Sequence, residues 1–273
     1  MTTAAPKRIP PLVETPTDIQ MPGKLVWADL FSTEPNASAR FYGSLFDWTP
    51  RTFTDEQGKY IVLRTEDGPV TGIVRGPDRK DKRPSARWVG YISTDNMPGA
   101  VAAIEANGGR VVGGPKDVPE RGDHLLAVDA EGALFGMMDS TAGDPLDKEV
   151  KAGELVWYNL FAYDPAAAAG FYEKVAGVES EAWRTEGFIL WSQGQKRAGI
   201  SPLDDQTTVT PTWVPFFRVT DMDRKLTTAR RIGAKTVVER RTLETGSEIV
   251  ILSDTMGAVF ALVELSDEVE ESQ

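Results

Sequence analysis

The sequence predicts an α+β protein of two similar domains, each built from two copies of a strand–helix–strand–strand–strand unit. The first observation is a long internal match, because GKLVWADLFSTEPNASARFYGSLFDW at residues 23–48 is matched by GELVWYNLFAYDPAAAAGFYEKVAGV at residues 153–178. The second is a weaker match within the first half, where DGPVTGIV at 67–74 is matched by EGALFGMM at 131–138. The repeating unit is therefore about 60 residues long and occurs four times.

Nearly constant offsets between matching residues indicate a true duplication. Trp27 and Trp157 are 130 positions apart, whereas Asp129 and Asp254 are 125 apart. The order of the matches is kept while a few loop residues differ. The predicted organisation is an extended N-terminal arm at 1–22, a first domain at 23–140, a linker at 141–153, a second domain at 154–265 and an acidic tail at 266–273.

The local pattern of the unit is clearest in the first copy. An apolar strand at 25–31 is followed by a helix start, where Ser, Thr and Glu at 32–34 suit the cap and Pro35 suits the first turn. Apolar residues recur every four positions at Ala37, Phe41 and Leu45, which predicts one buried face of that helix. Three short strands are then expected, near 52, at 60–63 and at 70–74, separated by turn sequences.

Composition excludes several partners. The chain has 30 Lys and Arg against 41 Asp and Glu, a net charge of −11, so nucleic acid is not expected to bind. The absence of cysteine excludes disulfides and thiolate nucleophiles. No apolar run reaches the length of a membrane span, and the start of the sequence lacks the apolar centre of a signal peptide, which together predict a cytoplasmic protein. The duplication supplies internally what a dimer would supply, which favours a monomer.

The chain resembles the vicinal oxygen chelate superfamily, the group of glyoxalases, bleomycin-resistance proteins and extradiol dioxygenases. The resemblance covers about residues 23–265 and is closest to the tandem-domain glyoxalase-like branch, whose members are also called hydroxylases. The motifs that carry it are ARFYGSLFDW and AGFYEKVAGV, GGRVVGGPKDV and GAKTVVERRTL, and DAEGALFG and DTMGAVFA. The resemblance implies that each pair of units folds into an eight-stranded cup with helices outside and a ligand inside.

The same resemblance implies where a metal would bind, at the first and last strand of each unit. Alignment places these positions at Trp27, Val89, Trp157, Val214, Gly72, Gly136, Gly199 and Ala261. These side chains are not metal ligands, and the chain has one histidine, His124, where an iron triad or a glyoxalase site needs several donors. We therefore expect no metal and no cofactor, and neither iron dioxygenase nor zinc or nickel glyoxalase activity.

Strand alternation predicts which side chains face the cups. The predicted ligand-binding residues are Trp27, Asp29, Phe31, Tyr91, Trp157, Asn159, Phe161, Trp183, Trp191, Phe216 and Arg218. The two large indoles at 27 and 157 could either line a cavity or fill it. Asp29 favours a polar or liganded cavity, because a carboxylate on an inward face is costly unless it is paired or hydrated. Arg218 could hold an acidic ligand group or form a salt bridge.

Three classes of function remain open. The first is metal-independent binding of a small, planar organic molecule in an aromatic cup. The second is a cofactor-independent lyase or isomerase that uses Asp29 as general base and Tyr91 or His124 as acid. The third is a catalytically silent scaffold.

Overall fold

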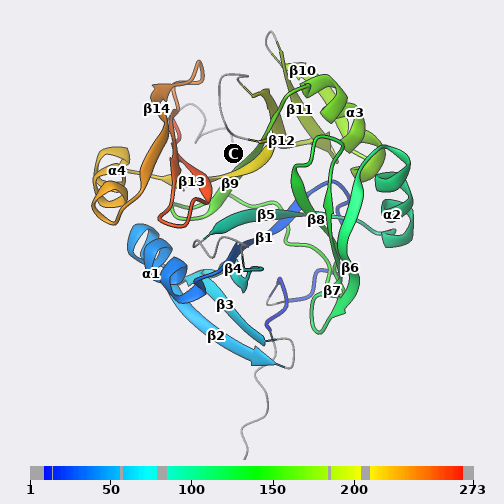
Figure 1. Cartoon of the computed structure of the whole chain (residues 1–273), viewed down its shortest axis with the longest axis horizontal. Helices are drawn as coiled ribbons and strands as arrows, with labels where there is room; N and C mark the ends of the chain where they lie inside the picture. The colour runs from blue at the N-terminus through cyan, green and yellow to red at the C-terminus, as the bar shows by residue number, and fades with distance from the viewer. Residues whose placement is uncertain are drawn as a thin grey trace, which may run out of the picture.

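A computed structural model describes residues 9–13, 15–55, 58–78, 85–183, 186–203 and 210–266 of the protein. It contains two eight-stranded mixed sheets, each accompanied by two helices (Figure 1). This confirms the predicted α+β class and the four strand–helix–three-strand units. The predicted acidic tail lies outside the described residues from position 267 onward.

The elements of the two halves follow the same order. The first half contains β1 (Leu25–Ser32), α1 (Pro35–Phe46), β2 (Thr49–Asp55), β3 (Gly58–Thr65), β4 (Gly68–Arg75), β5 (Ala86–Ser93), α2 (Met97–Ala106), β6 (Arg110–Val118), β7 (Gly122–Val128) and β8 (Leu134–Asp139). The second half contains β9 (Leu155–Ala162), α3 (Pro165–Ala176), β10 (Glu179–Trp183), β11 (Gly187–Ser192), β12 (Gln195–Pro202), β13 (Thr212–Val219), α4 (Met222–Arg231), β14 (Lys235–Thr242), β15 (Glu248–Ser253) and β16 (Val259–Glu264).

The first strands of the two units lie at the centre of each sheet. The order is β2-β3-β4-β1-β5-β8-β7-β6 in the first sheet and β10-β11-β12-β9-β13-β16-β15-β14 in the second. β1 and β5 are antiparallel to each other, and each is parallel to the last strand of its own unit. Side chains of β1 and β5 that face the cup therefore meet at its floor.

Short polar side chains stabilise the N-terminal ends of α2, α3 and α4. In α2, α3 and α4, the side chain of the residue before the helix accepts a hydrogen bond from a first-turn backbone N–H; these residues are Asn96, Asp164 and Asp221. α1 is different, because Glu34 makes no side-chain cap and its backbone N–H donates instead to Ser32 Oγ at 3.0 Å. None of the helices in the described ranges has the length and apolarity that crossing a lipid bilayer requires.

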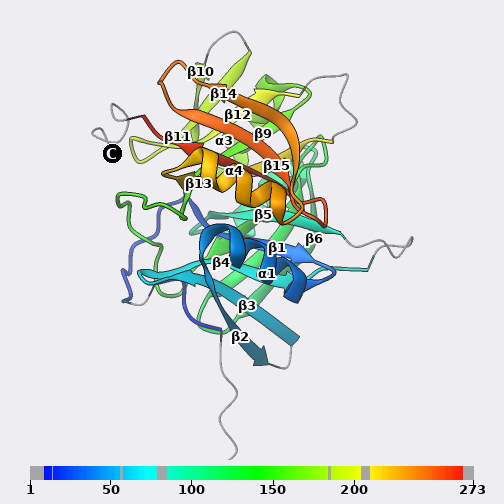
Figure 2. The same ribbon diagram turned by 90° about the vertical axis from the view of Figure 1, so that its left-hand side faces the viewer.

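One hydrophobic core joins the convex sides of both sheets. α1 lies beside α4 (Figure 2) and α2 beside α3 (Figure 1), so helices of different domains pack against each other. The core includes the fully buried rings of Trp88 and Phe135 from the first domain and of Phe217 and Phe260 from the second. The two domains therefore share their core and fold around a common interior.

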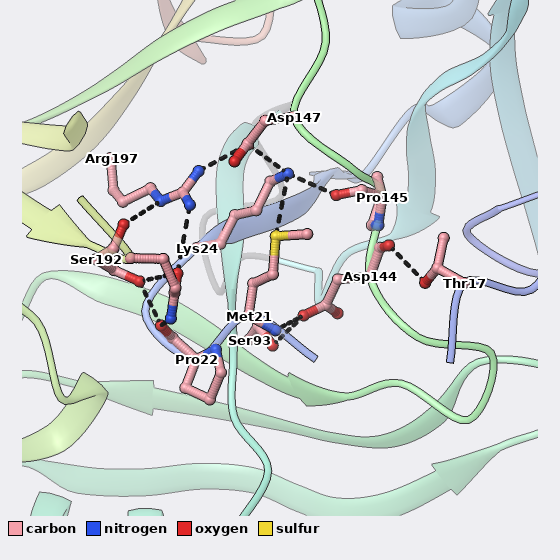
Figure 3. Close-up of polar contacts among 11 residues, drawn as sticks. Thr17, Met21, Pro22, Lys24, Ser93, Asp144, Pro145, Asp147, Ser192 and Arg197 are labelled. Carbon is pink, nitrogen blue, oxygen red and sulfur yellow. Dashed lines mark hydrogen bonds and ion pairs between the residues drawn. The ribbon is translucent and has the colours of Figure 1, made fainter. Parts of the chain in front are cut away.

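Polar contacts, some buried and some partly exposed, hold the N-terminal arm and the linker together (Figure 3). Asp144 is fully buried, and its Oδ2 accepts hydrogen bonds from Met21 N at 2.7 Å and Ser93 Oγ at 2.5 Å. Asp147 Oδ1 lies 2.7 Å from both Lys24 Nζ and Arg197 Nη1, one from each domain. The linker thus contacts the arm and both domains.

Candidate functional site

The first domain contains a cavity of about 310 Å³ on the concave side of its sheet. Strands β1, β3, β4, β5, β6 and β7 supply its walls, and Ile9 of the N-terminal arm closes part of it. Its polar and aromatic lining residues include Asp29, Phe31, Tyr60, Tyr91, Arg121 and His124. Four of these, at 29, 31, 91 and 124, are residues that the sequence analysis singled out.

A depression of about 480 Å³ lies near the β10 edge of the second sheet. Of its lining residues only Ser192 is buried, and the Ser192 hydroxyl already donates to the Pro22 carbonyl at 2.6 Å. Exposed glutamates form much of the remaining wall. The first-domain cavity is instead lined by buried charged and phenolic side chains, so we regard it as the candidate site.

A chain of hydrogen bonds crosses the floor of the cavity. Arg121 Nη1 donates to Tyr60 Oη at 3.0 Å, and Tyr60 Oη donates to Asp29 Oδ1 at 2.7 Å. The Trp27 indole Nε1 lies 2.9 Å from the same carboxylate oxygen and 3.0 Å from Tyr60 Oη. The network therefore links a buried carboxylate to a buried guanidinium through one phenol.

Arg121 is the cation of this network and is 1% exposed. Its Nε donates to the backbone carbonyl of Pro10 in the N-terminal arm at 2.9 Å. The guanidinium carbon lies 4.4 Å from the centre of the Trp27 ring and 5.1 Å from that of Tyr60, which stabilises the charge through cation–π contacts. Two aromatic faces and an acidic neighbour thus compensate the burial of a positive charge.

Burial dominates the protonation behaviour of the site. It raises the pKa of Asp29 above its ordinary value, although Arg121 and hydrogen bonds from Tyr60, Trp27 and Tyr91 act in the opposite direction. Burial and the nearby carboxylate also raise the pKa of Tyr60 and of Tyr91 well above the usual value for a phenol. Both phenols are therefore protonated donors at neutral pH.

His124 lies on β7 with its ring centre 5.4 Å from that of Tyr91. Burial, followed by the charge of Arg121, lowers its pKa to about 3, so the imidazole is neutral at physiological pH. It donates one hydrogen bond to the backbone carbonyl of Arg121, and its Nε2 has no hydrogen-bond partner within the described residues.

Glycines make room for the acidic and phenolic side chains. The strand register pairs Asp29 with Gly72 and Tyr91 with Gly136. A Cβ atom at Gly72 would overlap Tyr60 Oη and Asp29 Oδ1, and one at Gly136 would overlap the Tyr91 ring. The first-strand positions expected from the resemblance are Trp27 and Val89, whereas the residues paired with these glycines lie two positions further along each strand.

The residues at this position do not fit a divalent metal ion. Such a site needs three or four converging donors, and the described parts of the chain contain no group of three His, Cys, Asp or Glu side chains that could form one. Two residue pairs face each other in the strand register of the first cup, Asp29 with Gly72 and Tyr91 with Gly136, and among them only Asp29 carries a carboxylate. Tyr60 already connects this carboxylate by hydrogen bonds to the Arg121 guanidinium. The described residues of the first cup therefore lack the donor set of a divalent metal site.

The second cup lacks most of this polar chemistry. Strand register and spacing give the counterparts of Tyr60, Tyr91, Arg121 and His124 as Gly187, Phe216, Gly246 and Ile249. Asn159 replaces Asp29, and its amide Nδ2 donates to the Leu160 carbonyl at 3.0 Å. Trp157 and Phe161 are half-buried and pack on an apolar cluster that contains Phe216.

The remaining predicted residues do not line the first cavity. Arg218 Nη1 donates to the carbonyl of Val150 in the linker. Trp183 is 44% exposed on the edge strand β10, and Trp191 lines the surface depression. Lys196 Nζ lies 5.9 Å and 5.5 Å from the centres of these two rings. Trp27 lies beneath the cavity, where it supports Asp29 and Arg121.

Sequence reasoning missed Tyr60 and Arg121. Alternation within the predicted strand at 60–63 would have placed Tyr60 on the same face as Val62, opposite the apolar face that meets the helix. Arg121 precedes β7 in a turn, where no periodic pattern indicates the direction of a side chain.

Comparisons with known proteins agree with this fold. No protein-family model matches the chain. It is 28% identical to the anthracycline biosynthesis protein DnrV of Streptomyces peucetius over 261 residues, covering 90% of this chain and 94% of the relative. It is 24% identical to the "Putative glyoxylase CFP32" of Mycobacterium bovis over 242 residues, covering 87% of this chain and 93% of the relative.

Solved structures with the same architecture include a glyoxalase and a dioxygenase. A Mn(II)-bound glyoxalase from Novosphingobium aromaticivorans superposes with a TM-score of 0.60 at 15% identity, covering 90% of this chain and 83% of that one. The 2,2′,3-trihydroxybiphenyl 1,2-dioxygenase of Sphingomonas wittichii gives a TM-score of 0.60 at 13% identity, covering 89% and 90%. The chain is a two-domain protein with the vicinal oxygen chelate fold, as its motifs predicted.

Proposed function

We propose that the first-domain cavity binds a small organic molecule with a planar, largely apolar skeleton, without a metal ion. The observation that carries this proposal is the cavity of about 310 Å³ with the Asp29–Tyr60–Arg121 network at its floor. Small-molecule sites combine apolar walls with a few fixed polar groups in this way. Phe31, Val74 and Leu126 supply apolar wall.

The difference between the two cups supports one site per chain. The first cup has a carboxylate, two phenols, a guanidinium and an imidazole at positions where the second has Asn159, two glycines, Phe216 and Ile249. Burying an ionisable side chain inside a cup costs free energy of folding. The presence of such side chains in the first cup therefore favours a functional role for that cup. The relative DnrV is named for anthracycline biosynthesis, and anthracyclines are polycyclic aromatic compounds, which is consistent with a planar ligand.

The test is a fluorescence titration of the full chain with a panel of planar phenols, quinones and aromatic acids. We expect at least one to quench tryptophan emission with a stoichiometry of one per chain. The affinity should be the same before and after treatment with a chelator. A chelator that abolishes binding would contradict metal independence, and silence across the panel would favour the scaffold function.

A matched pair of variants locates the site. Phe31→Ala removes part of the apolar wall of the first cavity and should weaken binding about 10-fold or more, because the ligand loses its contact with an aromatic ring. Phe161→Ala makes the same change in the second cup and should leave the affinity unchanged. Equal losses in both variants would contradict a single site in the first domain.

A second candidate function is proton transfer with Asp29 as general base. It is favoured by a buried carboxylate on the cavity wall whose pKa is raised by burial, with the protonated Tyr91 phenol beside it as a donor. The test is nuclear magnetic resonance of a bound carbonyl compound in D₂O. Deuterium should enter the carbon next to the carbonyl with the wild-type chain and not with Asp29→Asn, while both proteins still bind the compound. Absence of exchange with wild type would leave ligand binding as the function.

A further inference from the structure

Two side-chain atoms of the cavity-lining residues lack hydrogen-bond partners within the described chain. They are Arg121 Nη2 and His124 Nε2, and both are inaccessible to bulk solvent. The other nitrogens of the Arg121 guanidinium are used, since Nη1 donates to Tyr60 Oη and Nε donates to the Pro10 carbonyl. An unpaired polar atom in a buried site is unfavourable, which makes these two atoms candidates for contact with a ligand.

The two atoms differ in hydrogen-bond type. Arg121 Nη2 can only donate, because a guanidinium has no acceptor. The neutral His124 imidazole has one N–H, which is given to the Arg121 carbonyl, so its Nε2 can only accept. A hydroxyl group can satisfy a donor and an acceptor at the same time, because its oxygen accepts one hydrogen bond while its proton is donated in another.

We propose that the cavity selects a planar hydroxyl compound, a phenol or an enol, whose oxygen accepts a hydrogen bond from Arg121 Nη2 and donates one to His124 Nε2. This proposal rests on the proposed binding function and names its ligand class. The apolar walls match the flat carbon skeleton of such a compound, and phenolic and enolic hydroxyls are stronger donors than alcohols. The adjacent guanidinium favours an oxygen that carries partial negative charge.

Four other groups would satisfy the site less well. A carboxylate or an ether oxygen could accept from Arg121 but has no proton for His124. An ammonium group would donate to His124 but would be repelled by Arg121. A water molecule has the same donor and acceptor pattern as a hydroxyl, but it leaves the apolar walls without a partner.

The experiment is calorimetric titration of the full chain with 4-nitrophenol, 4-nitroanisole and 4-nitrobenzoate at a pH where the phenol is protonated. The anisole keeps the ring and the oxygen but cannot donate, and the benzoate is an anion without a donor. We expect 4-nitrophenol to bind at least about 10-fold more tightly than either of the others, the size of one lost hydrogen bond to a charged or buried group.

Two variants identify the atoms. His124→Ile copies the second domain's Ile249 and should bring the phenol-to-anisole affinity ratio close to 1. Lys235→Gln changes an exposed cation on β14 of the second domain, away from the cavity, and should leave the ratio unchanged. Equal binding of phenol and anisole by wild type would overturn the hydroxyl assignment and leave a water in that position. Tightest binding of the benzoate would replace it with a plain anion site. In both of these outcomes the proposed binding function survives, whereas failure of the larger panel contradicts it separately.

Discussion

Tyr42 of the first domain donates a hydrogen bond from its hydroxyl to Asp254 Oδ2 of the second domain at 3.1 Å. The same hydroxyl accepts from the Trp88 indole at 3.0 Å. The other oxygen of Asp254 accepts from the backbone N–H groups of Met256 and Ala258, each at 2.8 Å. A fully buried phenol therefore connects the core of one domain to a turn of the other.

The duplication repeats this contact in the opposite direction. Tyr172 of the second domain donates to Asp129 Oδ2 of the first at 3.0 Å and accepts from the Trp213 indole at 2.8 Å. Burial, opposed by these hydrogen bonds, raises the pKa of Asp129, as it does that of Asp254. Two Trp–Tyr–Asp triads thus fix the domains relative to each other from both sides, which explains why Tyr42 and Tyr172 match in the repeat.

Removal of one triad hydroxyl should destabilise the whole protein. Tyr42→Phe leaves the Trp88 N–H and Asp254 Oδ2 without this partner, so we expect the free energy of unfolding to fall by about 1–3 kcal/mol. Tyr172→Phe should have a similar effect. Tyr158→Phe is the control, because the buried Tyr158 hydroxyl has no hydrogen-bond partner among the described residues and its loss should be neutral or stabilising. Urea unfolding measures all three, and equal effects of the three variants would contradict the role of the triads.

A methyl group at Gly72 should disrupt the candidate site. In Gly72→Ala the new Cβ would overlap both Tyr60 Oη and Asp29 Oδ1, so we expect a loss of about 1–3 kcal/mol in stability and of ligand affinity. Gly170→Ala is the control, because nothing lies within 4 Å of a Cβ there and α3 should gain up to about 1 kcal/mol. Thermal unfolding and ligand titration distinguish the two. A Gly72→Ala protein with normal affinity would show that the floor of the cavity is not part of the site.

The sequence predicted most of the fold because duplication leaves constant offsets and strands alternate their faces. Asp29 and Phe31 lie on the cavity wall as alternation required, and Ala28 and Leu30 lie in the core beside the helices. Val26 is an exception, because a register irregularity between Leu25 and Trp27 places it in the cluster that contains Trp27.

The chemistry of the site was less predictable, since it depends on contacts distant in sequence. Arg121 reaches Tyr60, which is 61 positions away, and Pro10, which is 111 positions away. The spacing of residues along one strand cannot indicate contacts between segments so far apart in the sequence. Arg218 was placed in the cup by alternation, yet the linker carbonyl of Val150 accepts its hydrogen bond.

The N-terminal arm should contribute to both stability and ligand binding. Leu12 is 5% exposed and packs with Trp27 and Tyr91, next to the Pro10 carbonyl that orients Arg121. Leu12→Ala should lower the free energy of unfolding by about 2–4 kcal/mol and weaken ligand binding. Ile19→Ala, at a position that is 49% exposed, should change neither by more than about 0.5 kcal/mol. Urea unfolding with ligand titration tests both, and an unaffected Leu12→Ala protein would mean that the arm does not close the cavity.

The chain's one histidine makes a pH test unusually clean. The pKa of His124 is lowered from 6.5 to about 3 in the folded protein. Between these two pH values the imidazole is protonated in the unfolded chain but stays neutral in the folded chain. Stability present at pH 7 should therefore be lost as the pH falls towards 3, and by pH 5 the loss from this group should be roughly 1–2 kcal/mol.

The raised pKa values of Asp29, Asp129 and Asp254 act in the opposite direction, since protonation of these groups favours the folded state. They are present in both wild type and His124→Ile, so the difference between the two proteins, measured by urea unfolding from pH 7 to pH 5, isolates the imidazole. Parallel pH profiles would show that His124 titrates in the folded protein as it does in water, and Nε2 would then be a solvated group rather than the buried acceptor of a ligand hydroxyl.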